Sequence, residues 1–445
     1  MFGRKRFVLF GMVFFIGIMI TTSVTSSFLV AGDLPNQVNV SNSPTLEDIE
    51  PAIAVVGTVA HLVWTHQVDE ENDEIVYSSN TGGSFSNFVN ISTNPECDES
   101  PAIAVGPNGA LHVIWSSQNS STSKMDLCYA NMIGGVWSLP KVIDFNVTAD
   151  STDIAISSNG VVHIVYGSYD GIWHIDNHTG AFDSKVQLIS NTYSVAGNKI
   201  NYHPRVAVNS SGKAHVIWRH VHEYGVILEF ANSTLMYSLQ FNSTTFTIPM
   251  NVYYRHKGVH ETDITIGTSD MVHLVWTERS DRKVLLWYQN DLVYINVSSG
   301  MYLGVPADFS TPIVIRNQGD NYDPSITTDS SGAVHIFWRS GGNLHYANNN
   351  AGSFSNASYA LLYSKPDVIH YSPDIGVAES NLMITWCSEN TDSNETEIYF
   401  ASGEASELLE GLGPDPGAVI FAPTGVLLLG IIVAAVIHLK KKRRA

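Results

Sequence analysis

Acidic, aromatic and histidine side chains gather directly in front of a series of short apolar segments. Those nearest the segments are Glu50, Glu99, Tyr202, His203, Glu261, Tyr322, Asp323 and Tyr371. Two carboxylates can supply the acid and the nucleophile of glycosidic bond cleavage if they lie about 5–9.5 Å apart around one pocket. Mixed with aromatic rings, carboxylates can also bind a sugar or a peptide. These residues are the first candidates for a ligand site, although they do not form a recognisable catalytic set.

A second group of polar residues stands three positions before each apolar segment. Its members are Asp48, Asp98, Asp150, Asn201, His260, Asn321 and His370. Asp and Asn side chains in turns accept hydrogen bonds from their own backbone, and we expect this capping role here. The alternative is a polar, partly acidic basin for a sugar, a peptide or a cation.

Residues 219–225, with the sequence RHVHEYG, combine positive charge, hydrogen-bonding groups and an aromatic ring, as ligand sites often do. The candidate contacts are Arg219, His220, His222, Glu223 and Tyr224, together with Arg339 at the position that matches Arg219. We place this segment in a longer link between two strands. His220 and His222 are two residues apart, but no nearby third ligand completes a zinc site. The alternative interpretation is a solvated insertion.

A histidine recurs three residues before an aromatic residue in six places. These histidines are His61, His112, His163, His215, His273 and His335. A ring of metal ligands is one interpretation, but repetition in every copy favours packing, with each imidazole bonded to neighbouring backbone. The aspartate-rich loops expected of calcium sites are missing from the repeats. We therefore predict no metal and no cofactor.

These histidines belong to a repeat of about 50 residues that the stretch PAIAVGPNGALHVIW, residues 101–115, represents well. Each copy has a strand, a tight turn such as Asn108-Gly109, a second strand ending in an aromatic residue, a third strand with an aromatic, and a fourth strand. A seventh copy carries Met383 in place of the histidine. The pattern predicts an all-β, seven-bladed β-propeller of four-stranded blades over residues 37–402. Residues 37–41 match a fourth strand and should close the last blade.

The turn after the third strand resembles a worn Asp-box, the S-x-D-x-G-x-x-W turn of sialidase-like propellers. The best matches are residues 78–86 and 346–355, which carry Asn in place of the Asp. The resemblance implies a propeller fold. Sialidases also hold a substrate carboxylate with three arginines, for which planar guanidinium groups are well suited. That arginine pattern is not found, since the first arginine after the N-terminal segment is Arg205.

Both ends of the chain predict export and a membrane anchor. Residues 1–32 read as a signal peptide, with an uncleaved anchor as the alternative. Residues 403–417 form an acidic Gly/Pro stalk, residues 418–439 a transmembrane helix, and residues 440–445 a basic cytoplasmic tail. We expect a single-pass protein of the cell membrane, with its propeller outside the cell and its top face, which carries the segments leading into each blade, directed away from the membrane.

The chain has a net charge of −19, and 8 of its 23 lysines and arginines lie at the two ends, so the middle is still more acidic. An acidic middle repels phosphates, which excludes nucleic acid as a partner. Candidate N-glycosylation sites are Asn39, Asn90, Asn119, Asn146, Asn177, Asn209, Asn232, Asn242, Asn296, Asn356 and Asn394. The three cysteines, Cys97, Cys128 and Cys387, are too few for a disulfide scaffold. They serve as small apolar residues, or Cys97 and Cys128 form one bridge.

These observations predict a surface-anchored propeller that binds extracellular glycans or proteins through its top face. Two alternatives stay open. One is a glycoside hydrolase or sialidase-like enzyme that uses the carboxylates of the top face. The other is a structural surface-coat protein.

Overall fold

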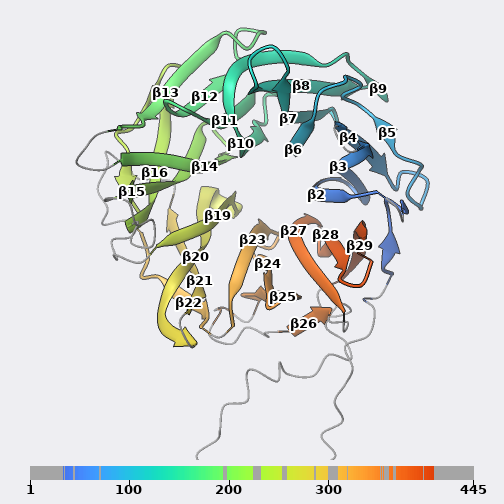
Figure 1. Ribbon diagram of the computed structural model, residues 1–445. Helices are drawn as coiled ribbons and strands as arrows, with labels where there is room; N and C mark the ends of the chain where they lie inside the picture. Colours follow the sequence, from blue (N-terminus) through green and yellow to red (C-terminus); the bar gives the residue numbers. More distant parts are fainter. Residues whose placement is uncertain are drawn as a thin grey trace, which may run out of the picture.

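The computed structural model describes residues 34–404, apart from 35, 44–45, 70–71, 194–197, 224–231, 253–257, 285–286, 299–308, 318, 351, 353, 355–359, 364–366 and 394. The predicted signal peptide, transmembrane helix and tail lie outside these residues, as does the predicted stalk beyond Glu404; the first two stalk residues, 403–404, end a strand instead. Within them, no helix is long and apolar enough to cross a membrane. The described part is all-β and propeller-like, with antiparallel sheets arranged around a common centre (Figure 1).

The strands fall into six sheets, which we give in chain order. The first contains β2 (Asp48–Val56), β3 (Val59–Asp69), β4 (Asn72–Ser79) and β5 (Val89–Asn90). The second begins with β6 (Asp98–Val105), β7 (Leu111–Asn119), β8 (Lys124–Ile133) and the short β9 (Val136–Trp137). It continues through β10 (Lys141–Ile156) into β11 (Val162–Ser168), β12 (Gly171–Asp176) and β13 (Ser184–Ser190).

The third sheet contains β14 (Asn198–Val208), β15 (Ala214–Glu223), β16 (Asn232–Asn242), β17 (Thr245–Phe246) and β18 (Met250–Asn251). The fourth contains β19 (Val259–Ile266), β20 (Met271–Val284), β21 (Trp287–Ser298) and β22 (Ile313–Arg316), with the 3-10 helix η2 (Thr268–Asp270) in its first turn. The fifth contains β23 (Asn321–Thr328), β24 (Val334–Ser340), β25 (Asn343–Asn348) and β26 (Ala360–Tyr363). The sixth contains β27 (Val368–Ala378), β28 (Asn381–Asn390), β29 (Glu395–Glu404) and β1 (Val38–Asn39).

The long strand β10 takes part in two repeat units. Its first half pairs with β8, and its second half, from Thr152, pairs with β11. Five copies carry a proline near the start of the inner strand, whereas this copy has Thr152 and the fifth copy has Thr262 in that place. Loss of the proline does not by itself join two units, because the fifth copy begins a separate strand at Val259.

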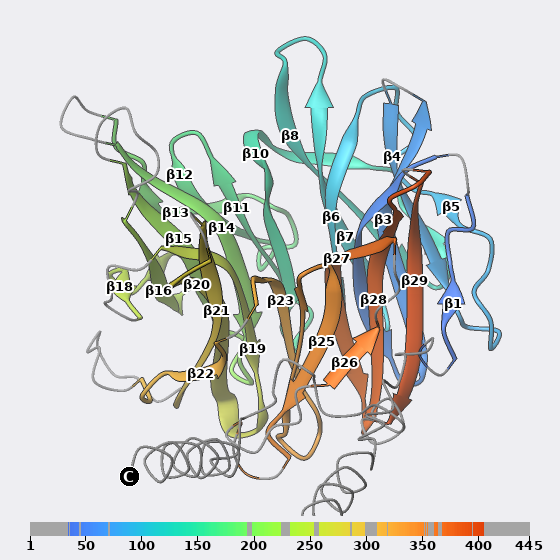
Figure 2. The same cartoon turned by 60° about the horizontal axis from the view of Figure 1, so that its bottom comes forward.

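The strand β1 brings the two ends of the described chain together. Val38 lies opposite Phe400 and Asn39 opposite Tyr399, and the Val40 N–H donates to the Ile398 carbonyl at 2.7 Å. Because neighbouring strands are antiparallel, β1 begins at the face where β29 ends. Figure 2 shows β1 and β29 side by side at the edge of the molecule. We call this face the bottom face; the starts of the inner strands and the connections from second to third strands share the opposite, top face.

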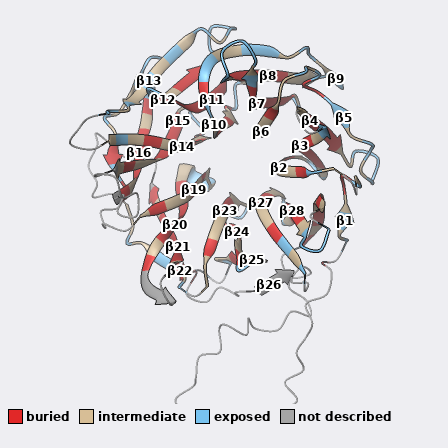
Figure 3. Cartoon of the chain, viewed as in Figure 1, coloured by how far each residue is buried: buried red, intermediate tan, exposed pale blue. Residues whose placement is uncertain are grey.

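The inner strands β2, β6, β10, β14, β19, β23 and β27 form a continuous ring, because each contacts the next and β27 contacts β2. The core lies between the sheets, and the middle strands are the most buried (Figure 3). The second strand of six copies carries a fully buried tryptophan: Trp64, Trp115, Trp218, Trp276, Trp338 and Trp386. Large aromatic surfaces buried between sheets stabilise the stacking of neighbouring units.

The tight turns after the inner strands depend on glycine. Gly109 has φ 71° and Gly160 has φ 85°, a left-handed region that glycine enters at little cost. The preceding asparagines do not share this conformation, although the sequence suggested that they would. The strand ladders nevertheless continue on both sides of these turns.

Candidate functional site

A cavity of about 320 Å³ lies on the axis, where the first residues of the inner strands meet. All seven inner strands contribute to its wall. The polar residues of the wall are Glu50, Ser100, Thr152, Asp153, Arg205, Glu261, Thr262, Asp263, Asp323, Ser325, Ser372 and Asp374. We call this cavity the axial pocket. Of the candidates named from the sequence, it brings together Glu50, Glu261 and Asp323.

Three aspartates of the axial pocket tie neighbouring inner strands together. Asp153 accepts the N–H of Val206 at 2.7 Å, Asp263 accepts that of Ile326 at 2.8 Å, and Asp374 accepts that of Ile53 at 2.9 Å. The second oxygen of each accepts the N–H of the next residue in its own strand, at 2.8–2.9 Å. Each carboxylate therefore joins one repeat unit to the next. The sequence analysis did not select these aspartates, although Asp153, Asp263 and Asp374 occupy the same place in three copies.

The same layer of the pocket also contains Arg205. Burial raises the pKa of Asp153 to about 6 and that of Asp263 to about 7, although Arg205 and the backbone N–H donors oppose the rise. Burial also raises the pKa of Asp374. One guanidinium thus shares the pocket wall with three aspartates whose ionisation is disfavoured by burial, and Asp153 and Asp263 can donate or accept protons near neutral pH.

The outer rim of the pocket is built from strained backbone. In five copies the residue before the repeated proline has a positive φ: Glu50 (55°), Ser100 (56°), His203 (50°), Asp323 (49°) and Ser372 (48°). The strand register shifts at each of these residues, as in a β-bulge. Residues before proline normally avoid this region, and such strain gathers at functional sites.

Two carboxylates at the rim have well-defined hydrogen-bond partners. Glu50 Oε2 accepts the Ser100 N–H at 2.8 Å, across to the next copy. Glu261 Oε2 accepts the Thr277 hydroxyl at 2.6 Å, and burial raises the pKa of Glu261. Within the described residues, the buried hydroxyls of Thr152 and Thr262 have no hydrogen-bond partner. Both residues line the axial pocket, and their hydroxyl oxygens are buried within its wall.

Two arginines at equivalent positions have different surroundings. Arg339 lies opposite Tyr322, with its guanidinium carbon 4.8 Å from the ring centre, and its Nε donates to Asp323 at 2.7 Å. Arg219 likewise lies opposite Tyr202, but His203 replaces the aspartate. In the described part of the chain, Arg219 Nε is buried without a partner, and burial lowers the pKa of Arg219. Arg219 is therefore an unpaired donor near the rim.

The segment that contains Arg219 is a strand rather than a link, because β15 extends through Glu223. His220 Nδ1 lies 2.8 Å from Asn201 Oδ1, and the rings of His220 and His222 are 5.3 Å apart. Tyr224 lies outside the described residues. This extension arises because residues 219–223 pair continuously with both neighbouring strands.

Other sequence candidates lie beside the pocket rather than on its wall. Glu99 is half-buried opposite Ser116. Tyr322 donates its hydroxyl to Asp320 at 2.8 Å. Tyr371 lies opposite Cys387, and burial raises its pKa. None of these three residues lines the axial pocket.

An exposed aromatic pair on the top face was missed by the sequence analysis. Tyr169 is 75% exposed and Tyr193 45% exposed, and their rings stack with centres 5.1 Å apart. Tyr193 donates its hydroxyl to the Tyr169 carbonyl at 3.0 Å, which fixes the pair. The two residues flank different strands, so sequence spacing does not reveal their contact. Such a flat surface suits the apolar face of a sugar ring.

In three copies the polar residue three positions before the apolar segment has an internal role. Trp64 donates its indole N–H to Asp48, Trp218 to Asn201, and Trp338 to Asn321, at 2.7–3.0 Å. The acceptors are at most 3% exposed. They fasten the buried tryptophans instead of capping their own turns or forming an open basin.

The repeated histidines also belong to the scaffold, but their partners are tyrosine hydroxyls rather than backbone. The Nδ1 atoms of His61, His112, His215, His273 and His335 lie 2.6–2.7 Å from the hydroxyls of Tyr77, Tyr129, Tyr237, Tyr294 and Tyr346. In the fifth copy the partner is Tyr294.

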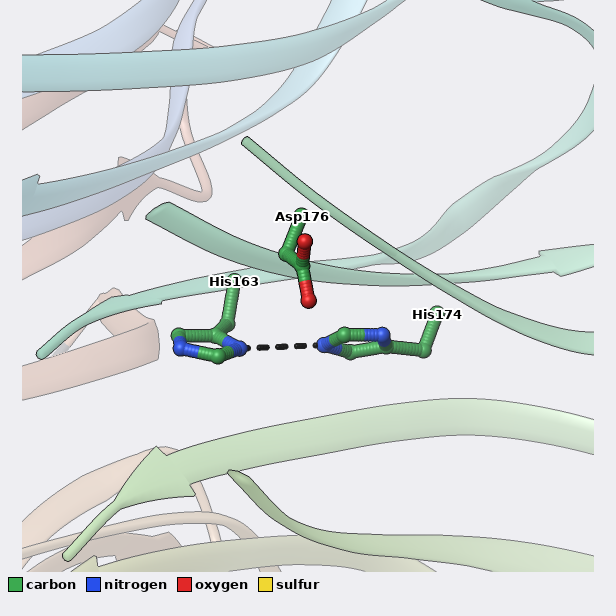
Figure 4. A group of neighbouring side chains, drawn as sticks. All are labelled: His163, His174 and Asp176. Atoms are coloured by element: carbon green, nitrogen blue, oxygen red, sulfur yellow. Dashed lines mark hydrogen bonds between the residues drawn. The ribbon is translucent and has the colours of Figure 1, made fainter. Parts of the chain in front are cut away.

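In the third copy a second histidine replaces the tyrosine. His163 Nδ1 lies 3.1 Å from His174 Nε2, and Asp176 points toward the pair (Figure 4). One ligand atom from each of the three residues lies within 4.8 Å of the others. The sequence analysis predicted no metal, because it treated all six histidines alike.

All three cysteines are free thiols. Cys128 and Cys387 are buried, and the Cys97 thiol donates to Asp73 at 3.2 Å. The proposed bridge between Cys97 and Cys128 is not formed. Among the sequons, Asn209 is buried and its Nδ2 lies 3.1 Å from His215 Nε2, so glycan attachment there would require this contact to break.

Comparison with known proteins identifies the fold of this chain but not its activity. No family model matches the chain, and no curated protein matches it. Solved structures do match. The α-L-arabinofuranosidase of Fusarium graminearum, of family GH93, in complex with arabinobiose is 10% identical with a TM-score of 0.52. This match covers 85% of the present chain and all of the fungal chain.

Two further structures extend the comparison. The Penicillium chrysogenum α-L-arabinanase complexed with arabinobiose is 12% identical over 85% of this chain and 99% of its own, with a TM-score of 0.51. A PL25 ulvan lyase bound to -[GlcA(1-4)Rha3S]- is 7% identical over 86% and 99%, with a TM-score of 0.55. The chain therefore has the fold of carbohydrate-active β-propeller enzymes.

Proposed function

We propose that this protein binds a neutral carbohydrate in the axial pocket and on the adjoining top face. The observation that carries the proposal is a pocket on the axis whose wall combines carboxyl groups, among them Glu50, Glu261 and Asp323, with the hydroxyl-bearing residues Ser100 and Ser325. Sugar hydroxyls can donate hydrogen bonds to the carboxylates. The stacked Tyr169 and Tyr193 supply an aromatic platform on the same face.

The charge of the axial pocket favours a neutral sugar over an anionic one. Its wall contains six carboxyl groups, from Glu50, Asp153, Glu261, Asp263, Asp323 and Asp374, and one guanidinium, from Arg205. A ligand with carboxylate or sulfate groups would be repelled, whereas a neutral sugar would not. The similar structures include complexes with the neutral arabinobiose and one with the anionic -[GlcA(1-4)Rha3S]-, so the charge of the pocket is what favours a neutral ligand here. The acidic pocket also differs from the arginine-rich site that the sialidase resemblance implies.

The architecture we propose is a seven-bladed propeller whose last blade is completed by the N-terminal strand. The ring of inner strands and the pairing of Val38 with Phe400 support it. The worn Asp-box turns at residues 78–86 and 346–355 support descent from sialidase-like repeats. We further propose that residues 418–439 anchor the protein, so that the top face points away from the cell surface.

A glycan array, probed with the purified full-length chain in detergent, tests the binding proposal. We expect binding to neutral glycans, and at least about tenfold weaker binding after replacing both tyrosines (Tyr169→Ala with Tyr193→Ala). Phe241→Ala is the matched control, since Phe241 is an exposed aromatic residue near the C-terminal end of β16. Binding to anionic glycans alone, or no binding to any glycan, would overturn the proposal.

Glycoside hydrolysis is the second candidate, and it depends on Glu261. Burial raises the pKa of this carboxyl group at the rim of a pocket that contains other carboxylates, as expected of a general acid. Incubation with bound neutral glycans should then release reducing ends. Glu261→Gln should abolish this release while the chain still binds the glycan. Binding without release in the wild type would leave the binding function and exclude hydrolysis.

A further inference from the structure

The third copy of the repeat differs from the others at two positions that face one another. In the other copies with a repeated histidine, the partner on the third strand is a tyrosine; here it is His174. The residue directly opposite the histidine in the ladder is Asn131, Asn296 or Asn348 in three copies, and here it is Asp176. Both changes introduce side chains that commonly bind metals.

The three side chains converge in the interior of the protein. His163 is 2% exposed, Asp176 1% and His174 not at all. His163 Nδ1 and His174 Nε2 are 3.1 Å apart, and the Asp176 carboxylate is directed toward the space beside them (Figure 4). Two nitrogens bound to one tetrahedral zinc ion at 2.0–2.1 Å lie about 3.3 Å apart. The observed spacing is therefore close to that of a ligand pair.

Packing alone does not account for this arrangement. A tyrosine hydroxyl both donates and accepts, so it suits a neutral histidine, whereas two facing imidazole nitrogens share only one proton. Within the described residues, His163 Nε2 and His174 Nδ1 are also buried without partners. Burying such groups unpaired costs free energy. A cation bound by His163 Nδ1 and His174 Nε2 would engage both facing lone pairs, and each outer ring nitrogen would then carry the N–H.

A second cavity gives access to the cluster from outside. It has a volume of about 200 Å³, and its wall includes His163, Asp176, His178, Lys213 and Gln240. His178 Nδ1 contacts Asp176 Oδ1, and Gln240 Nε2 lies 3.4 Å from Asp176 Oδ2. These contacts orient the carboxylate, as outer partners do in metal sites. Lys213 adds a positive charge to the wall, which limits the affinity for a cation.

We propose that His163, His174 and Asp176 form a binding site for a first-row divalent transition metal ion, with Zn²⁺ as its representative. Two imidazole nitrogens and one carboxylate fit this class, whereas Ca²⁺ and Mg²⁺ require oxygen ligands. Water from the second cavity can fill the remaining coordination position. The site is separate from the axial pocket, so it stands independently of carbohydrate binding.

Metal titration of the full-length chain tests the site. After treatment with EDTA, the protein is titrated with ZnCl₂ by calorimetry and with CoCl₂ by visible absorption, which reports the ligand field. We expect one Zn²⁺ per chain and Co²⁺ bands of a site with mixed nitrogen and oxygen ligands. His174→Tyr and Asp176→Asn restore the residues found in other copies, so they should fold while weakening Zn²⁺ binding at least about tenfold.

His335→Gln is the matched control, because it removes an equally buried repeated histidine from another copy. It should leave the Zn²⁺ affinity unchanged. Circular dichroism and the metal-free Tm establish that each variant is folded. Absence of Zn²⁺ uptake by the wild type, or unchanged affinity in both His174→Tyr and Asp176→Asn, would overturn the proposal.

Discussion

Asp263 lies where the scaffold and the axial pocket meet, and its replacement by asparagine separates their contributions to stability. One carboxylate oxygen accepts the Ile264 N–H and the other accepts the Ile326 N–H, both at 2.8 Å. Asparagine keeps one acceptor and places an amide N–H₂ against the other backbone donor. A buried donor without an acceptor costs about 1–3 kcal/mol. We expect Asp263→Asn to destabilise the protein by this amount at acidic pH.

The wild-type carboxyl group adds a pH dependence that asparagine lacks. Burial raises its pKa from 3.8 to about 7, so between these values the folded state holds a proton that the unfolded state has released. The contribution of Asp263 to the free energy of unfolding therefore falls as the pH rises through this window, and it becomes level above about pH 7. At about 1.4 kcal/mol per pH unit, the loss has an upper bound of about 4 kcal/mol.

Together, these two effects predict that the free energies of unfolding of the wild type and of Asp263→Asn, plotted against pH, approach or cross one another. Asp263→Asn should be less stable than the wild type at pH 4.5, and this difference should shrink or reverse by pH 8. Unfolding is followed by fluorescence of the buried tryptophans at pH 4.5, 6 and 8. The control is Asp392→Asn, which changes an exposed carboxylate. Wild-type and Asp263→Asn curves that stay parallel across this pH range would refute a proton held by Asp263.

Three further predictions concern the rim, the repeated histidines and the thiols. Ser372→Gly should raise the Tm, because Ser372 has φ 48° before a proline and glycine relieves about 1 kcal/mol of strain; an unchanged or lower Tm would contradict strain there. Tyr237→Phe should lower the free energy of unfolding by about 1–3 kcal/mol, since buried His215 loses its partner, and a neutral effect would count against this bond. Cys97 should react slowly with iodoacetamide at pH 8, because burial raises its pKa to about 12. Mass spectrometry should find three alkylated thiols only after unfolding; rapid labelling of Cys97 in the native protein would be inconsistent with this pKa.

The architecture follows from sequence because every copy repeats the same local signals. Alternating strand and turn residues recur in each copy, and most copies add a closing tryptophan and a proline at the inner strand. The sequence did not predict two departures from this pattern. The strand β10 continues between two units, and at residues 219–223 the strand β15 extends through a predicted link.

The site was predictable only in part, because hydrogen-bond partners lie far apart in the chain. Glu50, Glu261 and Asp323 line the axial pocket as acidic residues near the strand starts. In three copies the polar residue three positions before the apolar segment accepts the indole N–H of a buried tryptophan. Alternation along the strand sets this direction, whereas the sequence pattern favoured turn capping. The contact between Tyr169 and Tyr193 joins two connections and depends on how the units pack.

Differences between copies are the best guide to chemistry in a chain of this kind. Copies that share a scaffold have the same packing demands, so a departure at one position needs a local cause. Arg339 is paired with Asp323, whereas Arg219, with His203 in the matching place, has an unpaired Nε among the described residues. Exchange of one partner thus turns a scaffold arginine into a free donor at the rim. We expect Arg219→Gln to weaken glycan binding with little change in Tm, and Arg339→Gln to lower the Tm by breaking its pairing with Asp323. If both variants lose stability equally, Arg219 belongs to the scaffold, and differences between copies do not mark the ligand site.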